Sequence, residues 1–257
     1  MTTTLAIANQ KGGVAKTTTV ASLGAALAEL GHRVLLVDLD PQACLTFSLG
    51  IDPEDLELSL HHVLTKGLPA TEVIVTTEEG VDLLPATIEL ARAEADLLTR
   101  TGREHALKTA LEDLEGEAYD WILLDCPPSL GILTVAALTA AQAVLIPLQC
   151  ETLSHRGVGQ LLDTVHDVRR FTNRTLQVWG VLPTLYDGRT NHARRVLETI
   201  SETYDLEVVE PPIPKTIKFA EAPAAGRSIL RTSRSSKGAQ AYREVAVHLV
   251  ARSGRGG

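Results

Sequence analysis

The sequence has few cysteines, and those it has are poorly placed to stabilise a fold. Only three occur in 257 residues: Cys44, Cys126 and Cys150. Their odd number and wide spacing give neither a disulfide framework nor a zinc-binding pattern, which indicates reduced thiols and a cytosolic protein. A chain of this length buries about 70–75% of its unfolded surface, so it needs no such covalent or metal support.

Long apolar runs are also missing. The longest weakly polar stretch, 135–148, is interrupted by Thr139, Gln142 and Pro147, so we expect no membrane-spanning helix. The first residues lack a basic region, and the apolar run at 5–8 is too short for a signal peptide. With 44% hydrophobic and 22% charged residues, the composition is that of a globular protein and excludes disorder as the main state.

Acidic and basic residues are divided unevenly along the chain. Residues 1–150 contain 8 Lys and Arg against 21 Asp and Glu, whereas residues 151–257 contain 16 against 11. Seven basic residues and one acid, Glu221, fall within 215–243. This asymmetry is typical of an acidic protein with one face that binds a polyanion, although charges scattered over a solvated surface give the same count.

Apolar segments alternate with amphipathic ones along most of the chain. Strands are expected at 5–9, 33–38, 73–76, 81–84, 121–125, 143–148 and 176–182. Helices are expected at 17–30, 88–99, 104–114, 131–140, 156–170, 190–203 and 237–252. This alternation predicts an α/β fold, a doubly wound, mostly parallel sheet with helices on both faces, in a single domain over 1–257.

A glycine-rich loop at 9–19 lies between the first expected strand and the first expected helix. Backbone N–H groups at a helix N-terminus point toward a bound anion, and Gly12 and Gly13 let the main chain approach phosphates closely. Lys16 would reach the β- and γ-phosphates of a nucleotide, and the Thr17 hydroxyl would bind Mg²⁺. A glycine-rich turn with solvated lysines is the alternative.

Two features separate this loop from the general pattern G-x-x-x-x-G-K-[ST]. Both glycine positions are substituted, by Gln10 and Ala15, and a second lysine, Lys11, lies inside the loop. The run Lys-Gly-Gly-Val-Ala-Lys-Thr at 11–17 resembles the deviant Walker A loop of the ParA/MinD ATPases. Four more segments resemble this family in the same order, and the last two are typical of its chromosomal ParA (Soj) branch: 37–42, 122–128, 182–190 and 213–223.

The resemblance implies a P-loop NTPase that binds ATP with Mg²⁺ and hydrolyses it slowly. Nucleotide contacts are expected from Lys11, Gly12, Gly13, Val14, Ala15, Lys16, Thr17, Thr18, Pro214 and Thr216. The expected catalytic residues are Lys11, Lys16 and Asp40, of which Asp40 would orient the attacking water. The expected metal site consists of Thr17, Asp38 and Asp125; as alternatives, Asp125 would cap a turn, and the two earlier aspartates would form a polar strand end.

Two positions depart from most relatives. Glycine is usual where Ala15 stands, and a methyl group there is tolerable if the residue keeps a negative φ, so nucleotide binding is expected to survive. Asparagine is frequent near Thr216, and this puts the side-chain contact to the base in doubt while leaving main-chain contacts.

In the family, the lysine equivalent to Lys11 crosses a dimer interface to the partner's nucleotide. We therefore expect a monomer with ADP and a sandwich homodimer with ATP, which would double any basic surface. Non-specific DNA binding is expected from Arg189, Lys218, Arg227 and Arg231, with Arg234 and Lys237 in support. A ParB-type centromere-binding partner is implied by the resemblance alone.

The preferred function is a DNA-partitioning ATPase in the cytoplasm, associated with the nucleoid. One alternative is a MinD-like or cargo-positioning ATPase that acts on a membrane or a protein cluster. Another is a nucleotide-gated DNA-binding protein with negligible turnover. The membrane alternative is weakened by the last expected helix, because its apolar residues Tyr242, Val245 and Leu249 are more typical of a core than of an inserted face.

Overall fold

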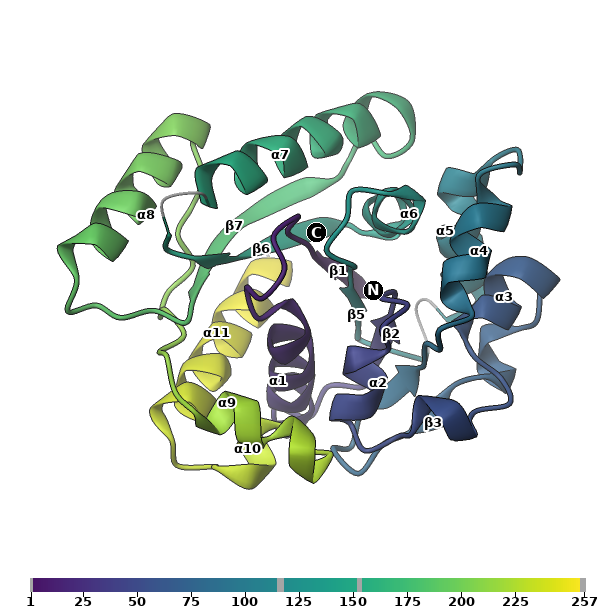
Figure 1. Cartoon of the computed structure of the whole chain (residues 1–257), viewed down its shortest axis with the longest axis horizontal. Coiled ribbons are helices and arrows are strands. Elements are labelled where there is room, and N and C mark those ends of the chain that lie inside the picture. The colour runs from purple at the N-terminus through teal and green to yellow at the C-terminus, as the bar shows by residue number, and fades with distance from the viewer. Residues whose placement is uncertain (1, 115–117, 152–153, 255–257) are drawn as a thin grey trace.

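One seven-stranded sheet runs through the computed structural model, which describes residues 2–114, 118–151 and 154–254. The strand order is β3-β4-β2-β5-β1-β6-β7. The strands are β1 (Thr3–Ile7), β2 (Val34–Asp38), β3 (Val75–Thr76), β4 (Asp82–Leu84), β5 (Trp121–Asp125), β6 (Ala143–Gln149) and β7 (Gln177–Thr184). Of these described strands, only β3 and β4 pair antiparallel, so the predicted mostly parallel, doubly wound sheet is confirmed (Figure 1).

Helices connect most of the strands and extend to the end of the described chain. They are α1 (Lys16–Glu29), α2 (Cys44–Ser48), α3 (Leu60–Lys66), α4 (Leu90–Leu97), α5 (Ala106–Leu111), α6 (Ile132–Ala140), α7 (Ser154–Phe171), α8 (Asn191–Tyr204), α9 (Lys218–Glu221), α10 (Ile229–Thr232) and α11 (Lys237–Ser253). The short helices α2, α3, α9 and α10 were not expected. The helix expected at 104–114 is divided into α5 and two flanking 3₁₀ turns.

The strands pack against helices on both faces because successive residues point to opposite sides of a sheet. On β1, Ala6 belongs to the apolar cluster under α3 to α7, while Leu5 and Ile7 belong to the cluster under α1 and α11. Figure 1 shows α1 and α11 side by side, and the buried hydroxyls of Thr19 and Tyr242 join them by a hydrogen bond of 3.0 Å. The apolar face of α11 is therefore part of the core, as expected.

The carboxyl ends of the parallel strands gather at one edge of the sheet, where open α/β sheets bind their ligands. The loop between β1 and α1 leaves the sheet there, and Asp38 and Asp125, the last residues of β2 and β5, are register neighbours. This edge brings the predicted phosphate loop and two predicted metal ligands together. Among the described helices, none has the length and apolar character needed to cross a bilayer.

Candidate functional site

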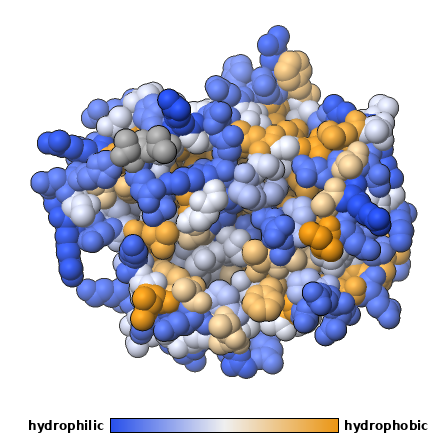
Figure 2. Space-filling view, viewed as in Figure 1, coloured by the Kyte–Doolittle hydropathy of each residue, from blue (hydrophilic) through white to orange (hydrophobic). Residues whose placement is uncertain are grey.

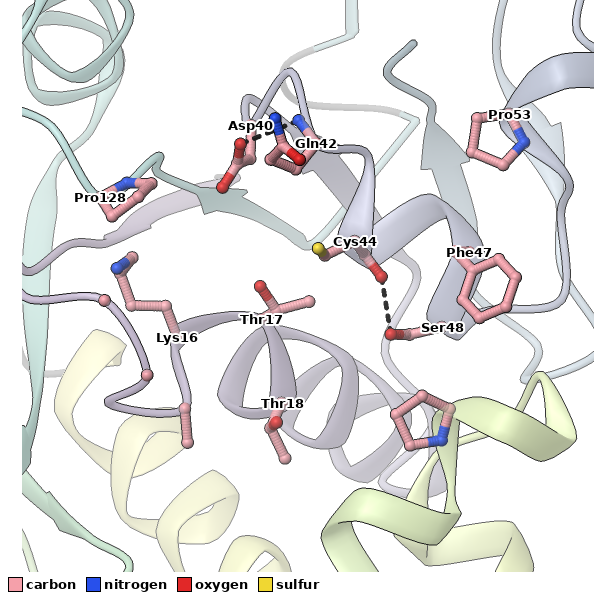
Figure 3. A pocket seen from close by; sticks show the side chains of 14 residues that line it. Lys16, Thr17, Thr18, Asp40, Gln42, Cys44, Phe47, Ser48, Pro53 and Pro128 are labelled. Atoms are coloured by element: carbon pink, nitrogen blue, oxygen red, sulfur yellow. Dashed lines mark hydrogen bonds between the residues drawn. The ribbon is translucent and has the colours of Figure 1, made fainter. Parts of the chain in front are cut away.

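A cavity of about 610 Å³ opens at this edge, between the loop that precedes α1 and the segment that follows β2. Figure 3 shows Lys16 and Thr17 on one side of the cavity and Asp40 on the other. The other lining residues are Gly12, Gly13, Ala15, Thr18, Gln42, Cys44, Phe47, Ser48, Pro53, Pro128 and Pro223. The volume is in the usual range for small-molecule sites.

Hydrogen bonds tie the loop to two other strands. Nδ2 of the buried Asn9 donates to the Pro147 carbonyl at 2.7 Å, and its Oδ1 accepts from the Lys11 N–H at 3.0 Å. The Thr184 hydroxyl donates to the Val14 carbonyl at 2.9 Å. The Val14 side chain is itself buried, so its predicted ligand contact is restricted to the backbone.

The two glycines leave open space beside the loop. A Cβ at Gly12 or Gly13 would meet no heavy atom within 4 Å, and Gly13 has a φ of +73°. Among the residues that the structure describes, no side chain caps the N-terminus of α1. Its first backbone N–H groups therefore suit an anion that enters this space.

Ala15 corrects an expectation about the loop. A methyl group at this position was expected to be tolerable if the residue keeps a negative φ, whereas the φ of Ala15 is +62° and its ψ is 36°, in the left-handed region. This conformation costs an L-residue about 1–2 kcal/mol, a cost that glycine largely avoids. The loop thus turns into α1 through a strained alanine.

Lys16 reaches into the interior of the site. It is 7% exposed, and its Nζ donates to the Lys11 carbonyl at 3.1 Å. Burial lowers the pKa of Lys16, while the negative charges of Asp125 and Asp40 oppose this shift. The ammonium thus lies close to carboxylates at the base of the loop, where it can also meet phosphate oxygens.

Asp125 carries a buried carboxylate that lacks hydrogen-bond partners. It is 1% exposed, and neither oxygen meets a donor within the described residues. Burial and the nearby charge of Asp38 raise the pKa of Asp125 well above its usual value, although the Thr17 hydroxyl and Lys16 oppose this. Unpartnered oxygens beside a hydroxyl are a suitable donor set for Mg²⁺, which prefers few protein ligands, phosphate oxygens and water.

The described residues around Asp125 do not include a cluster of several metal-binding side chains. Among residues 2–114, 118–151 and 154–254, no three His, Cys, Asp or Glu side chains group as a metal site.

Both carboxylate oxygens of Asp38 accept hydrogen bonds from residues that follow it closely in the chain. One oxygen accepts from the backbone N–H and the hydroxyl of Thr46 at 2.9 and 2.7 Å, and the other accepts from the Asp40 N–H at 3.1 Å. Burial raises the pKa of Asp38 to about 6. Its direct structural effect is to hold α2 and to place the Asp40 carboxylate on the cavity wall. Its predicted role near the metal stays a prediction.

Some predicted nucleotide contacts lie outside the cavity lining. Pro214 pairs with Tyr186 in an isolated β-bridge, and the Thr216 hydroxyl accepts from the Lys218 N–H at 3.4 Å. Pro223, from the same family-like segment, lines the cavity instead. Lys11 is also absent from the lining, and its ammonium lies 2.5 Å from Glu151.

The predicted DNA contacts fall into two groups. Arg227 forms an ion pair with Glu78, and Arg231 lies 4.0 Å from the buried carboxylate of Glu79. Arg189 is exposed and, within the described chain, forms no ion pair. Figure 2 shows hydrophilic surface over α8 and the loop before it, which contains Arg189.

Several residues at the site had not been singled out as such. Phe47 and Cys44 reach the cavity from α2, and Pro53 follows in the next turn. The one feature of the sequence that could have indicated these residues is their position shortly after the predicted Asp38–Asp40 segment. Glu151 had none, because it meets Lys11 across 140 positions of sequence.

Comparisons with known proteins find one matching family model and several relatives that align along nearly the whole chain. A family model described as an AAA domain matches residues 2–178. Sporulation initiation inhibitor protein Soj of Bacillus subtilis is 44% identical over 96% of this chain and 98% of its own length. Chromosome-partitioning ATPase Soj of Thermus thermophilus is also 44% identical, over 96% and 95%.

Two solved structures extend these comparisons. A Mycobacterium smegmatis protein named cobyrinic acid a,c-diamide synthase, with bound ADP and magnesium, is 57% identical over 97% of this chain and 94% of that one, with a TM-score of 0.87. The septum site-determining protein MinD of Pyrococcus horikoshii, complexed with Mg-ADP, is 27% identical over 97% and 96%, with a TM-score of 0.77. Both cover nearly the whole chain.

The strain at Ala15 predicts that Ala15→Gly stabilises the protein. Relief of the left-handed alanine exceeds the added freedom of glycine in the unfolded chain, so the free energy of unfolding should rise by about 0.5–1 kcal/mol in urea titrations. Ala21→Gly, in the right-handed part of α1, should instead lower it by about 1 kcal/mol or more. A loss of stability in Ala15→Gly would contradict the strain.

The orphaned carboxylate predicts that Asp125→Asn stabilises the protein without ligand and weakens its response to nucleotide. Replacing a buried carboxyl group whose ionised form is penalised by burial, and whose oxygens lack hydrogen-bond donors among the described residues, should raise the free energy of unfolding by about 1–3 kcal/mol at neutral pH. Addition of MgATP should then stabilise the variant much less than the parent. Asp120→Asn, which breaks the 2.9 Å ion pair with Arg33, is the control and should not gain stability. A destabilised Asp125→Asn would refute this account of the carboxylate.

Proposed function

The chain belongs to the ParA/MinD superfamily, in its chromosomal ParA (Soj) branch, as a partitioning ATPase, and we propose that ATP bound with Mg²⁺ switches it between two states. With ATP, two copies form a sandwich dimer that binds DNA non-specifically, and hydrolysis returns the monomer. Residues 1–257 would form one ATPase domain that acts at the nucleoid with a ParB-type partner.

The observation that carries this proposal is the opposite placement of the two loop lysines. Lys16 is buried and lines the cavity, whereas Lys11 is outside the lining and partly exposed. A lysine that does not face its own cavity suits a contact with the nucleotide of a second copy. A cation supplied across an interface accelerates phosphoryl transfer by about 10³–10⁵ in GTPases.

Phosphoryl transfer requires positioning and charge neutralisation more than covalent chemistry. Lys16 and the backbone N–H groups at the start of α1 would bind the β- and γ-phosphates. Thr17 and Asp125 would hold Mg²⁺, which supplies neutralisation of phosphate charge when it is bound. Asp40 would orient the attacking water, and the hydrogen bond of its N–H to Asp38 fixes the backbone from which it reaches the cavity.

The DNA-binding part of the proposal depends most on Arg189 and Lys218. Both are exposed. The loop that contains Arg189 and the segment that leads into α9, whose first residue is Lys218, are joined where the Lys215 N–H donates to the Tyr186 carbonyl at 3.2 Å. Arg227 and Arg231 would contribute less, because Glu78 and Glu79 already offset their charge. Phosphate contacts from two chains of a dimer would add.

Membrane attachment through the last helix is disfavoured. Tyr242, Val245 and Leu249 of α11 are fully buried in the core, so their apolar face is not available for insertion. A MinD-like mode would require another surface.

Amide synthesis, which the name of the Mycobacterium smegmatis protein suggests, is also disfavoured. An enzyme that transfers acyl groups through a cysteine uses the thiolate form as the nucleophile. Burial raises the pKa of Cys44 and Cys126, and that of Cys150 to about 11. All three thiols are therefore kept protonated at neutral pH.

DNA binding should require ATP and depend on Arg189 more than on Arg227. In Asp40→Ala protein, whose hydrolysis is blocked, Arg189→Glu should weaken binding to a random duplex about tenfold and reduce its salt dependence. Arg227→Glu should weaken it less, because Glu78 already neutralises Arg227. Fluorescence anisotropy with ATP and with ADP measures both effects. Equal affinity with the two nucleotides, or full binding by Arg189→Glu, would contradict the proposal.

A further inference from the structure

Glu151 lies at the junction between β6 and α7, with its carboxylate against Lys11. Lys11 Nζ and Glu151 Oε2 are 2.5 Å apart, and the two side chains are 31% and 52% exposed. The hydrogen bond and charge of Lys11 lower the pKa of Glu151, and Lys215 adds a smaller effect in the same direction. The carboxylate is therefore ionised at neutral pH and offsets the charge of Lys11.

The backbones of both partners are held in place. The Lys11 N–H donates to Asn9 at 3.0 Å. The Glu151 N–H donates to the Gln149 carbonyl at 2.8 Å, and the Glu151 carbonyl accepts from the Ser154 N–H at 3.0 Å, where α7 begins. The ion pair thus joins the loop before α1 to the residue that follows Cys150 at the end of the β6 segment.

The first turns of α7 also press against the loop. A Cβ on Gly157 would lie 3.3 Å from Asn9 Oδ1 and 4.0 Å from Lys11 Cβ. Lys11 therefore lies beside α7, and its ammonium contacts Glu151 rather than pointing into the cavity that Lys16 lines. Any movement of Lys11 toward a second copy has to break this pair.

We propose that Glu151 is a positioning residue that holds Lys11 within its own chain until the triphosphate of a second copy replaces it. The inference rests on the proposed function. A terminal phosphate offers more negative charge and more acceptor oxygens than one carboxylate, so it competes well for the ammonium. Because a two-fold dimer uses the same surface twice, two such pairs must break for each dimer that forms.

The exchange is feasible because the pair is weak. Ion pairs between exposed side chains contribute little to folding, since water and salt screen them. Glu151 would therefore not decide whether the chain folds. It would set the ATP concentration at which the dimer forms.

Sedimentation velocity over a series of ATP concentrations tests the proposal, in Asp40→Ala protein so that hydrolysis does not deplete the dimer. Glu151→Gln should lower the ATP concentration for half-dimerisation by about three- to tenfold. Glu151→Asp, which keeps the charge, should return it toward the parent value. Glu207→Gln is the matched control, because it breaks another exposed pair, with Arg252 at 2.7 Å, near the amino end of β7.

A second pair of variants tests whether Glu151 acts as a latch, meaning that it holds Lys11 within its own chain, or only through a general effect of its charge. In a Lys11→Gln background, Glu151→Gln should change dimerisation by less than about twofold, since the two residues act as a unit. Equal or weaker dimerisation in Glu151→Gln, or an effect that persists without Lys11, would overturn the latch alone. A parent protein that stays monomeric at every ATP concentration would overturn the proposed function and the latch with it.

Discussion

Three buried charged residues are the constraint on which the site depends: Asp38 and Asp125 end two central strands, and Lys16 begins α1 at the same edge of the sheet. Lys16, Asp38 and Asp125 are 7%, 0% and 1% exposed, and their formal charges do not cancel. Charges removed from water are costly unless they are paired and hydrogen-bonded, and both oxygens of Asp125 lack a partner within the described chain. The arrangement is consistent with residues that complete their coordination only with a phosphate and a cation.

One of these charged residues, Asp38, also holds a segment of the cavity wall in place. Asp38 holds α2 through Thr46. Beyond α2, Gly50 approaches Gly226 so closely that a Cβ on Gly50 would lie 3.1 Å from the Gly226 carbonyl oxygen. Arg227, the next residue, pairs with Glu78. The cavity wall and part of the basic segment are thus in continuous contact, while Arg189 lies apart from this path in the loop before α8.

The sequence predicted the sheet, the longer helices and the placement of Lys16, Thr17 and Asp40, because periodic burial and a strand–loop–helix motif are local patterns. It did not predict α2, whose five residues are held by a tertiary bond from Asp38. The condition under which a methyl group at Ala15 was expected to be tolerable, a negative φ, is not met, because the turn into α1 determines this backbone. The sequence had no means to find Glu151, because an ion pair between residues 140 positions apart leaves no local pattern.

The central claim is that Lys11 acts on the nucleotide of a second copy, and mixing two inactive variants tests it most directly. Lys11→Gln and Asp40→Ala should each hydrolyse ATP very slowly alone. In a mixed dimer, one site would combine an intact Asp40 with a Lys11 from the partner, so an equimolar mixture should regain up to about a quarter of the parent rate. A mixture no faster than the average of the two variants would contradict the account.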